Sequence, residues 1–188
     1  LKITKDLEKL ISANNGIFEV KLCINQGEYL TNMSHMFHDC SSILYLPDIS
    51  ELNTFHVTDM SYLFYGCNLL ENIPNISKWN LSNVENLGYM FFNCSNLISL
   101  PDISNWDISN VKDLSHLFSN CASLKELPDI SKWNISKVHN ISYMFSCCNS
   151  LTKIPDISVW NTEKVNNIEY LFYGCKSLNS LPDLSKWN

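Results

Sequence analysis

The sequence predicts an α/β repeat solenoid, in which stacked short parallel strands alternate with short helices. Three regularities predict it, each with a period of 27 residues. Phenylalanine keeps this period at Phe37, Phe64, Phe91, Phe118, Phe145 and Phe172. Cysteine keeps it at Cys40, Cys67, Cys94, Cys121, Cys148 and Cys175, and proline at Pro47, Pro74, Pro101, Pro128, Pro155 and Pro182. A fixed period in this range is typical of solenoids, in which each unit packs on its neighbours.

Residues 1–29 are expected to form an N-terminal cap made of a helix and a strand. Leu7, Leu10 and Ile11 follow Thr4 at helical spacing, and residues 17–24 alternate between apolar and polar side chains. Packed on the first repeat, this cap would cover its apolar end. Residues 30–188 hold six repeats, the last one incomplete, and no matching C-terminal cap follows. We therefore expect the chain to be a fragment, a trimmed piece or the ordered part of something longer, and the sequence does not decide whether the array itself continues.

Each repeat is predicted to begin with a short helix. The fourth repeat has the i, i+3, i+4, i+7 spacing of one helix face, at Leu114, Leu117, Phe118 and Cys121. The position before this pattern holds preferred N-cap residues, namely Asn32, Asp59, Asn86, Asp113, Asn140 and Asn167. The position before the repeated cysteine holds Asp39, Gly66, Asn93, Asn120, Cys147 and Gly174. Glycine and asparagine best tolerate the left-handed conformation that ends a helix, so Cys147 is the exception.

The short strand of each repeat is predicted at the segment that reads LPDIS in the first repeat, residues 46–50. Stacked copies of this segment would pair in parallel. Because proline lacks an N–H group, the strand is expected to begin at or just after it. A second extended stretch is expected before each new cap, at Val57, Val84, Val111, Val138 and Val165.

Composition and charge argue against several classes of function. The net charge is −6 and no cluster of lysine appears, so a nucleic-acid partner is not expected. The apolar runs are far shorter than a membrane span, so no membrane insertion is expected. The sequence contains no glycine-rich phosphate loop, nucleophile elbow or short-spaced metal motif. Catalytic residues, metals and cofactors are therefore not predicted.

The eight cysteines are interpreted as free thiols. Six of them occupy one equivalent position per repeat within the apolar pattern, where a buried thiol behaves as a small hydrophobe. Disulfide frameworks belong mainly to small secreted domains. The 27-residue spacing also lacks the short intervals of a zinc site. An intracellular location is favoured on these grounds, with the cell surface as the alternative.

The motif SYLFYGC (Ser61 to Cys67), together with the LPDIS and KWN segments, resembles the BspA-like leucine-rich repeat family. The variant with Trp-Asn and Asn-Val is similar to the Mycoplasma-type surface-lipoprotein repeats. The resemblance covers residues 30–188 and implies a leucine-rich-repeat-like solenoid with a parallel sheet along one face. Family members are often bacterial or protist surface proteins linked to adhesion. The family offers no catalytic motif to carry over.

Two columns of equivalent positions are candidate partner-binding residues. The changing column differs in chemistry from repeat to repeat, at His38, Tyr65, Phe92, Ser119, Ser146 and Tyr173. Solenoid faces bind through such a row on a constant frame, and unconstrained exposure is the alternative. The acidic column consists of Asp48, Asp102, Asp129, Asp156 and Asp183, with Asn75 in the second repeat. Local capping of the serine two residues later explains this column without a partner, and recognition of a cation or a basic partner is the alternative.

A third column is aromatic and is expected on the short helix, at His35, Tyr62, Tyr89, His116, Tyr143 and Tyr170. Packing between adjacent repeats is its favoured use. A partner-binding stripe is the alternative, because tyrosine suits interfaces.

The sequence thus predicts a non-enzymatic leucine-rich-repeat scaffold that mediates protein–protein interaction, including as a structural subunit of a larger assembly. A cell-surface adhesin of the BspA-like type is the alternative, which follows from the family resemblance alone. The sequence identifies neither the protein partner nor the oligomeric state.

Overall fold

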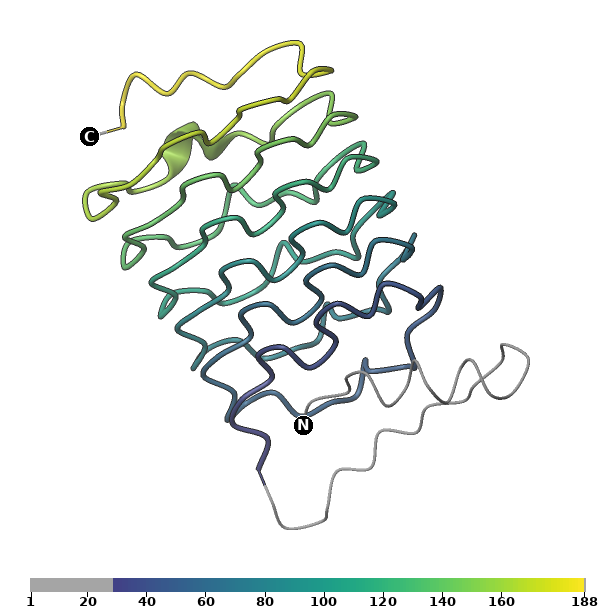
Figure 1. The fold of residues 1–188 in the computed structure, drawn as a ribbon. Helices are drawn as coiled ribbons and strands as arrows, with labels where there is room; N and C mark the ends of the chain where they lie inside the picture. Colours follow the sequence, from purple (N-terminus) through teal and green to yellow (C-terminus); the bar gives the residue numbers. More distant parts are fainter. Residues whose placement is uncertain (1–28, 188) are drawn as a thin grey trace.

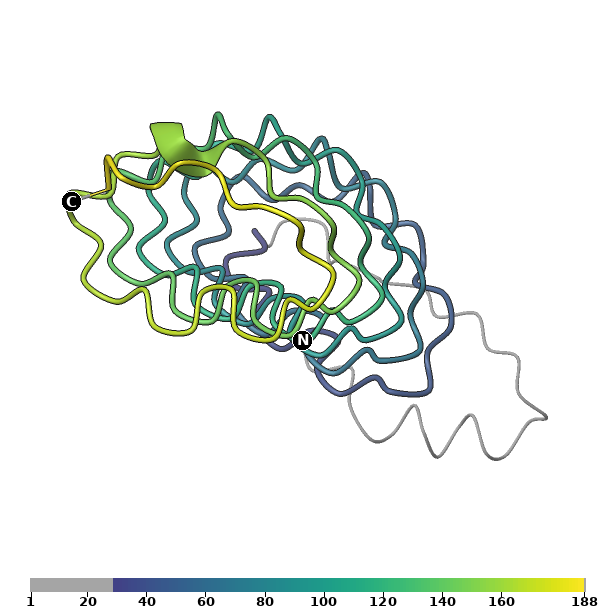
Figure 2. The ribbon, with the colours of Figure 1, turned by 90° about the horizontal axis from the view of Figure 1, so that it is seen from above.

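A computed structural model describes residues 29–187, which wind into one elongated stack of coils (Figure 1). Seen from above, successive coils follow nearly the same oval path, each displaced along the axis (Figure 2). The repeats lie side by side in sequence order, with the first at one end of the stack and the sixth at the other. The solenoid that the 27-residue period predicts is therefore the fold of this chain.

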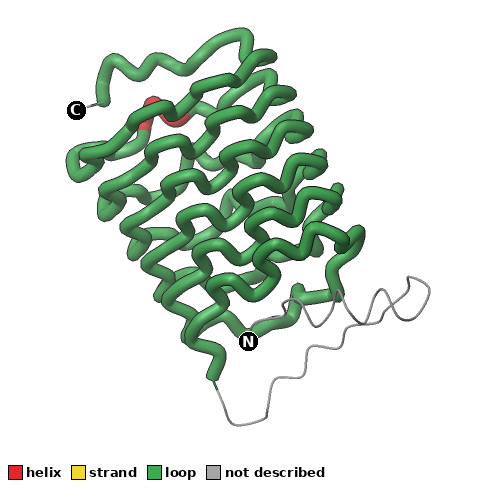
Figure 3. The backbone as a smooth tube through the Cα atoms, viewed as in Figure 1, coloured by secondary structure: helices red, strands yellow, loops and turns green. Residues whose placement is uncertain are grey.

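Regular secondary structure is nearly absent from the described residues (Figure 3). Within residues 29–187 the sole helix is a 3-10 turn, η1 (Ile157–Val159), and no strand extends beyond a single bridge. Isolated parallel bridges join neighbouring repeats at Asn32–Asp59, Asp59–Asn86, Asn72–Ser99, Asn86–Asp113, Asp113–Asn140 and Asn140–Asn167. The predicted alternation of short strands with short helices is not confirmed.

A run of turns takes the place of the predicted helix. This turn segment covers residues 33–40 and, in the later repeats, residues 60–67, 87–94, 114–121, 141–148 and 168–175. In the third repeat the N–H groups of Tyr89 and Phe91 donate to the carbonyls of Ser115 and Leu117 in the next repeat, at 2.9 and 3.0 Å. The N–H of Met90 lies between them and donates to the carbonyl of Leu87 at 3.2 Å, which closes a turn. Alternate donors thus bind the neighbouring repeat, whereas an α-helix would keep them within the segment.

Left-handed backbone at two positions of each turn segment explains why no helix forms. Tyr89 and Asn93 have φ of 60° and 58°, and an α-helix requires negative φ throughout. The left-handed residue predicted at the position of Asn93 is confirmed in all six repeats, including Cys147 at 58°. The sequence carries no such signal for the position of Tyr89. Aromatic residues occupy it at a steric cost of about 1–2 kcal/mol each.

Side chains at the predicted N-cap position close Asx turns instead of capping helices. Oδ1 of Asp59 accepts the backbone N–H of Ser61 at 2.9 Å, and the equivalent side chain accepts the equivalent N–H in each of the other five repeats. Two further columns repeat this bond along each coil, as at Asn80 and Asp102. Asx turns satisfy backbone donors where the chain changes direction, so the coil turns without regular secondary structure.

The apolar side chains of the turn segments form part of the core. The residues predicted for one helix face in the fourth repeat are all buried: Leu114, Leu117, Phe118 and Cys121. The repeated phenylalanines form a continuous ladder from Phe37 to Phe172, with neighbouring ring centroids 5.5–6.0 Å apart. Aromatic pairs at this separation contribute stability beyond the burial of each ring.

Two repeated side chains fasten each coil to the one before it. The thiol of Cys94 donates to the carbonyl of Phe64 at 3.1 Å, and the later repeats have the same bond. The indole N–H of Trp106 donates to the carbonyl of Ile76 at 3.1 Å, again with equivalents along the stack. These bonds give buried carbonyl oxygens a partner across the repeat boundary.

None of the seven cysteines within residues 29–187 forms a disulfide, as the sequence predicts. Burial raises the pKa of Cys94 to about 12. It also raises the pKa of Cys67, Cys121 and Cys148. These thiols therefore stay protonated at neutral pH and act as packing groups and weak donors.

The LPDIS segments do not form strands in the described residues, which corrects the prediction for them. The proline has no N–H to donate, and the Asx turn of the acidic column bends the chain directly after it, as at Asp48. Five of the six parallel bridges lie next to the valine column, where a second extended stretch is predicted. The sixth joins Asn72 to Ser99, directly before the LPDIS segments of their repeats. Next to the valine column the N–H of Glu85 donates to the carbonyl of Thr58 at 2.8 Å, and the N–H of Met60 to the carbonyl of Asn86 at 3.0 Å.

The predicted N-terminal helix and strand fall within residues 1–28, outside the described residues, as does Cys23. The cap at residues 1–29 therefore stays a prediction.

Candidate interaction surface

The changing column begins as a short stack of aromatic rings. His38, Tyr65 and Phe92 are half-buried and follow one another in successive repeats. The ring centroids of His38 and Tyr65 are 4.5 Å apart, and those of Tyr65 and Phe92 are 4.8 Å apart. Each ring belongs to the residue directly before the second left-handed position of its turn segment, so the same backbone presents all three. Three candidate residues thus form one continuous aromatic surface.

The rest of the changing column is different. Ser119 and Ser146 are only 5% and 3% exposed, so their side chains offer little surface to a partner. Tyr173 is 61% exposed. The column is therefore not a uniform stripe, and its ring stack is confined to the first three repeats.

A second stack of rings runs beside the first along the whole array. It consists of the aromatic column, with ring centroids of neighbouring repeats 4.3–4.8 Å apart. Each of these rings belongs to a left-handed residue with φ of 55–60°. Packing between adjacent repeats, the use that the sequence favours, is thus present in the structure.

We call the two stacks together the aromatic face, which comprises His35, His38, Tyr62, Tyr65, Tyr89, Phe92, His116, Tyr143 and Tyr170. Contacts across the stacks join them, with centroids 5.6 Å apart both for Tyr62 with Tyr65 and for Tyr89 with Phe92. The aromatic face is therefore two rings wide over the first three repeats and one ring wide in the fourth and fifth. In the sixth repeat Tyr173 again contacts Tyr170, with centroids 5.7 Å apart.

The tyrosine hydroxyls of the aromatic face reach solvent. Among residues 29–187 no hydrogen bond to these hydroxyls is present, and the one buried side-chain nitrogen or oxygen without a partner is Nδ1 of His116. Desolvation is the main cause that raises the pKa of Tyr62, Tyr89 and Tyr143. These phenols are neutral at pH 7, and each can donate and accept a hydrogen bond.

The charged side chains of the turn segments and of the Asx position before each of them are all negative. Residues 32–40 and their equivalents in the other five repeats contain no lysine or arginine, and they contain the carboxylates Asp39, Asp59, Asp113 and Glu169. The charge of Asp113 contributes to the raised pKa of both Tyr62 and Tyr89, so this carboxylate lies near the rings.

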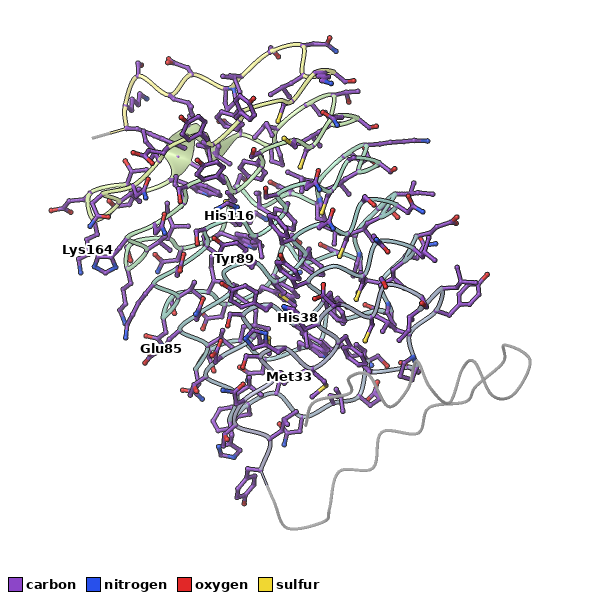
Figure 4. All side chains as sticks on the ribbon, in the orientation of Figure 1. Met33, His38, Glu85, Tyr89, His116 and Lys164 are labelled. Atoms are coloured by element: carbon purple, nitrogen blue, oxygen red, sulfur yellow. The ribbon has the colours of Figure 1, made fainter. Side chains whose placement is uncertain are left out.

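Figure 4 shows where part of the aromatic face lies on the stack of coils. His38, Tyr89 and His116 follow one another along the axis, while Glu85 and Lys164 lie at one edge of the molecule. Glu85 is itself paired, since its carboxylate accepts a hydrogen bond from the ammonium of Lys112 at 2.6 Å. The aromatic face is therefore a surface of rings, hydroxyls and carboxylates without a cationic side chain.

The acidic column is exposed and serves its own turns. Asp102, Asp129, Asp156 and Asp183 each accept the backbone N–H of the serine two residues later, at 3.0–3.1 Å. The hydrogen bonds of that serine lower the pKa of Asp102, Asp129 and Asp183. The local capping expected for this column is present. In the described residues no hydrogen bond, ion pair or ring contact joins it to the aromatic face.

Residues 29–187 contain no group of three or more His, Cys, Asp or Glu side chains arranged to hold a metal ion. They also contain no helix of the length and apolarity that crossing a bilayer requires.

The repeats match a known family over most of the chain. Residues 31–127 and 98–188 match the family described as Mycoplasma protein of unknown function, DUF285. The chain belongs to the DUF285 family. This match confirms the resemblance to the Mycoplasma-type, BspA-like leucine-rich repeats that SYLFYGC, LPDIS and KWN suggest. A search of curated proteins finds no match to this DUF285 chain.

Solved leucine-rich repeat proteins are similar to the DUF285 chain at low identity. One from Eubacterium ventriosum is 21% identical, with a TM-score of 0.44, over 69% of this chain and 31% of that chain. The leucine-rich repeat protein of T. pallidum is 20% identical, with a TM-score of 0.44, over 86% of this chain and 76% of that chain. One from Bacteroides ovatus is 15% identical, with a TM-score of 0.25, over 81% of this chain and 58% of that chain. The DUF285 chain thus spans only 31% of the length of the first of these proteins.

Proposed function

We propose that this DUF285 chain is a non-enzymatic scaffold that mediates protein–protein interaction. The observation that carries the proposal is the separation of a constant frame from a varied surface within each repeat. The phenylalanine, cysteine and tryptophan columns are mostly buried and repeat the same residue type. The changing column varies from His to Tyr, Phe and Ser on that frame. Repeat solenoids present their binding surfaces in this way.

The frame supports this function physically. Each coil is joined to the next by main-chain hydrogen bonds, a thiol bond and an indole bond, so the outer side chains keep a fixed spacing. A partner that contacts several repeats at once therefore meets a surface that is already ordered, which reduces the entropic cost of binding. Use as a structural subunit of a larger assembly belongs to the same proposal.

The candidate contact residues are those of the two predicted columns that reach solvent. In the changing column these are His38, Tyr65, Phe92 and Tyr173, and in the acidic column Asp102, Asp129, Asp156 and Asp183. Ser119 and Ser146 support the surface from below, since they are buried.

Crosslinking capture tests the proposal. The immobilised chain is incubated with a lysate of the source organism, and the retained proteins and their crosslinks are identified by mass spectrometry. The control is the Phe91→Asp/Phe118→Asp variant, in which buried charges destroy the frame. We expect a reproducible protein partner that the folded chain retains and the control does not, with crosslinks on the outer columns.

The adhesin alternative has a different signature. Antibody labelling of intact, unpermeabilised cells, together with no reproducible partner in the lysate, contradicts the scaffold proposal and favours the adhesin.

A further inference from the structure

We propose that the aromatic face binds a basic segment of a partner protein, one that carries lysine or arginine side chains. This inference rests on the proposed scaffold function and adds the surface and the chemistry of the partner.

Charge complementarity points to a basic partner. The aromatic face is bordered by Asp39, Asp59 and Asp113 over the first four repeats, and no lysine or arginine lies in the same parts of those repeats. Asp39 is already engaged within the chain, since its Oδ2 lies 3.2 Å from Nδ1 of His38. A cationic segment meets no like charge there, whereas an acidic one faces carboxylates alone. Opposite charges across an interface speed association and select the partner.

Two of these carboxylates are not needed for their turns. Asp59 and Asp113 each use Oδ1 to accept the N–H of the serine two residues later, at 2.9 and 2.8 Å. Asparagine performs the same task at the equivalent position of the other repeats, at Asn32, Asn86, Asn140 and Asn167. The turn therefore does not require the negative charge, which remains available to a ligand.

The rings and hydroxyls suit the rest of a basic side chain. The hydroxyls of Tyr62, Tyr65 and Tyr89 make no hydrogen bond within the described residues and can accept one from an ammonium or guanidinium group. The half-buried rings offer apolar surface to the aliphatic stems of lysine and arginine. Tyrosine and arginine are also the side chains most enriched in protein interfaces.

The rings of the aromatic column occupy positions whose backbone conformation is unfavourable for aromatic residues. All six residues of the aromatic column adopt the left-handed backbone conformation. At the other left-handed position of the turn segment, the third and fourth repeats use asparagine instead, at Asn93 and Asn120. Asparagine adopts this conformation more readily than tyrosine. Residues held in unfavourable backbone conformations are concentrated at binding sites.

A charge exchange that leaves the turns intact tests the proposal. The Asp59→Asn/Asp113→Asn variant places the asparagine of other repeats at both positions. The matched control is Asp107→Asn/Glu126→Gln, which removes the same charge from residues outside both the aromatic face and the acidic column. Asn80 already accepts, at 3.0 Å, the Asx bond that Asp107 accepts in the next repeat. Binding of fluorescent arginine–serine and lysine–serine peptides is measured by anisotropy, with a glutamate–serine peptide for comparison.

We expect saturable binding of the two basic peptides and none of the acidic one. The Asp59→Asn/Asp113→Asn variant should weaken binding about fivefold, and the control pair should leave it unchanged. Equal weakening by both pairs would show non-selective attraction to an acidic protein and would overturn the proposal. Absence of saturable binding to the basic peptides would also overturn it.

The rings are tested with substitutions that the frame already accepts. Tyr65→Ser and Phe92→Ser reproduce the residue at Ser119 and Ser146 of the same column. The double variant should fold, as judged by its thermal unfolding, and should lose the basic peptides more than about tenfold, because it removes two aromatic contacts. Unchanged peptide affinity in the folded double variant contradicts the proposal.

Failure of the aromatic-face proposal can be distinguished from failure of the scaffold proposal. If the Tyr65→Ser/Phe92→Ser variant retains the partner captured by the original chain, the chain is a scaffold but the aromatic face is not its binding surface. If neither form captures a partner, the scaffold proposal itself fails.

Discussion

Cys147 occupies a left-handed position that the other repeats fill with aspartate, asparagine or glycine. Its φ of 58° brings Cβ close to the following carbonyl, which costs about 1–2 kcal/mol for an ordinary side chain. Its thiol is not part of the buried cysteine column, since Cys148 fills that position and donates to the carbonyl of Phe118. The side chain of Cys147 therefore adds strain and no hydrogen bond to a neighbouring coil, and it accepts only a weak contact from the hydroxyl of Ser146.

Replacing Cys147 by glycine should stabilise the chain. We expect Cys147→Gly to raise the free energy of unfolding by about 0.5–1 kcal/mol, because glycine adopts positive φ without strain, as Gly66 and Gly174 do in their repeats. Urea unfolding measures the difference. Cys147→Val is the matched control and should destabilise the chain, because a β-branched residue is least suited to this conformation. A Cys147→Gly variant that is less stable than the original chain would contradict the reasoning.

His116 is a neutral histidine inside the long ring stack. Its ring lies between Tyr89 and Tyr143, at centroid distances of 4.3 and 4.5 Å, and its Nδ1 is buried without a partner. Burial lowers the pKa of His116 below its ordinary 6.5, and the nearby Asp113 opposes this only in part. In the folded chain His116 therefore binds fewer protons than in the unfolded chain once the pH falls below 6.5.

Acidification should therefore destabilise the chain through His116. Stability is unaffected above the unfolded pKa of 6.5 and decreases as the pH falls below it. The urea midpoint is compared between about pH 7.5 and about pH 5.5 for the original chain and for His116→Tyr, which inserts the ring of the adjacent repeats. The variant should show a smaller decrease. Identical pH dependence of both chains would rule out a contribution from His116.

The turn segment is the element that distinguishes this solenoid from the predicted one. The spacing of Leu114, Leu117, Phe118 and Cys121 correctly identifies the buried side chains, because a pair of turns and a helix can bury the same positions. The predicted helix and the observed turns differ in which carbonyl groups the backbone N–H groups bind. Alternate N–H groups reach the next repeat, and a single-repeat pattern contains no information about that neighbour.

The Asx turns hold the turn segment in place. Asn140 accepts the N–H of Ser142 at 3.0 Å, and Ser142 is only 5% exposed, so water does not readily replace the lost acceptor. Asn140→Ala should lower the free energy of unfolding by about 1–2 kcal/mol, because the N–H of Ser142 loses its partner.

Asn140→Asp is the matched control for this bond. Aspartate closes the same turn in the second repeat, where Asp59 accepts the N–H of Ser61 at 2.9 Å. The aspartate variant should stay within about 0.5 kcal/mol of the original chain in urea unfolding. Equal losses in the alanine and aspartate variants would show that the side-chain oxygen is not what matters.

At the scale of the whole molecule, the columns bind the coils into one unit. The phenylalanine ladder, the thiol bonds and the indole bonds all cross repeat boundaries, so each coil depends on its neighbours. Nearest-neighbour contacts of this kind make the stability of a solenoid approximately a sum over repeats and their interfaces.

Excision of one whole repeat should therefore be tolerated. Deleting residues 95–121 removes 27 residues and joins Cys94 to Ala122, with every column in register. The shortened chain should still unfold cooperatively, at a lower denaturant concentration, because one interface is lost. Circular dichroism during urea titration measures this. A deletion shorter by one residue breaks the register of all the columns and should abolish cooperative unfolding. Similar behaviour of the two deletions would contradict the dependence on register.

The candidate site was only partly readable from the sequence. The changing column is visible as variation at one position, but two of its members, Ser119 and Ser146, are buried. Their burial depends on neighbouring coils, which no local pattern describes. The left-handed backbone under the aromatic column was not predicted, because tyrosine and histidine do not favour it. The continuity of the ring stack could have been inferred from the period, since equivalent residues of stacked repeats are neighbours.

The 27-residue register by itself determined that the chain is a solenoid, which side chains form its core and that the cysteines of residues 29–187 form no disulfide. These features follow from apolar burial, which depends on residue type and spacing alone. Only the tertiary structure decided that the coils are built of turns, where the parallel bridges lie and which outer residues reach solvent. The reason is that backbone donors choose between acceptors in their own coil and in the next, and that choice exists only once the coils are stacked.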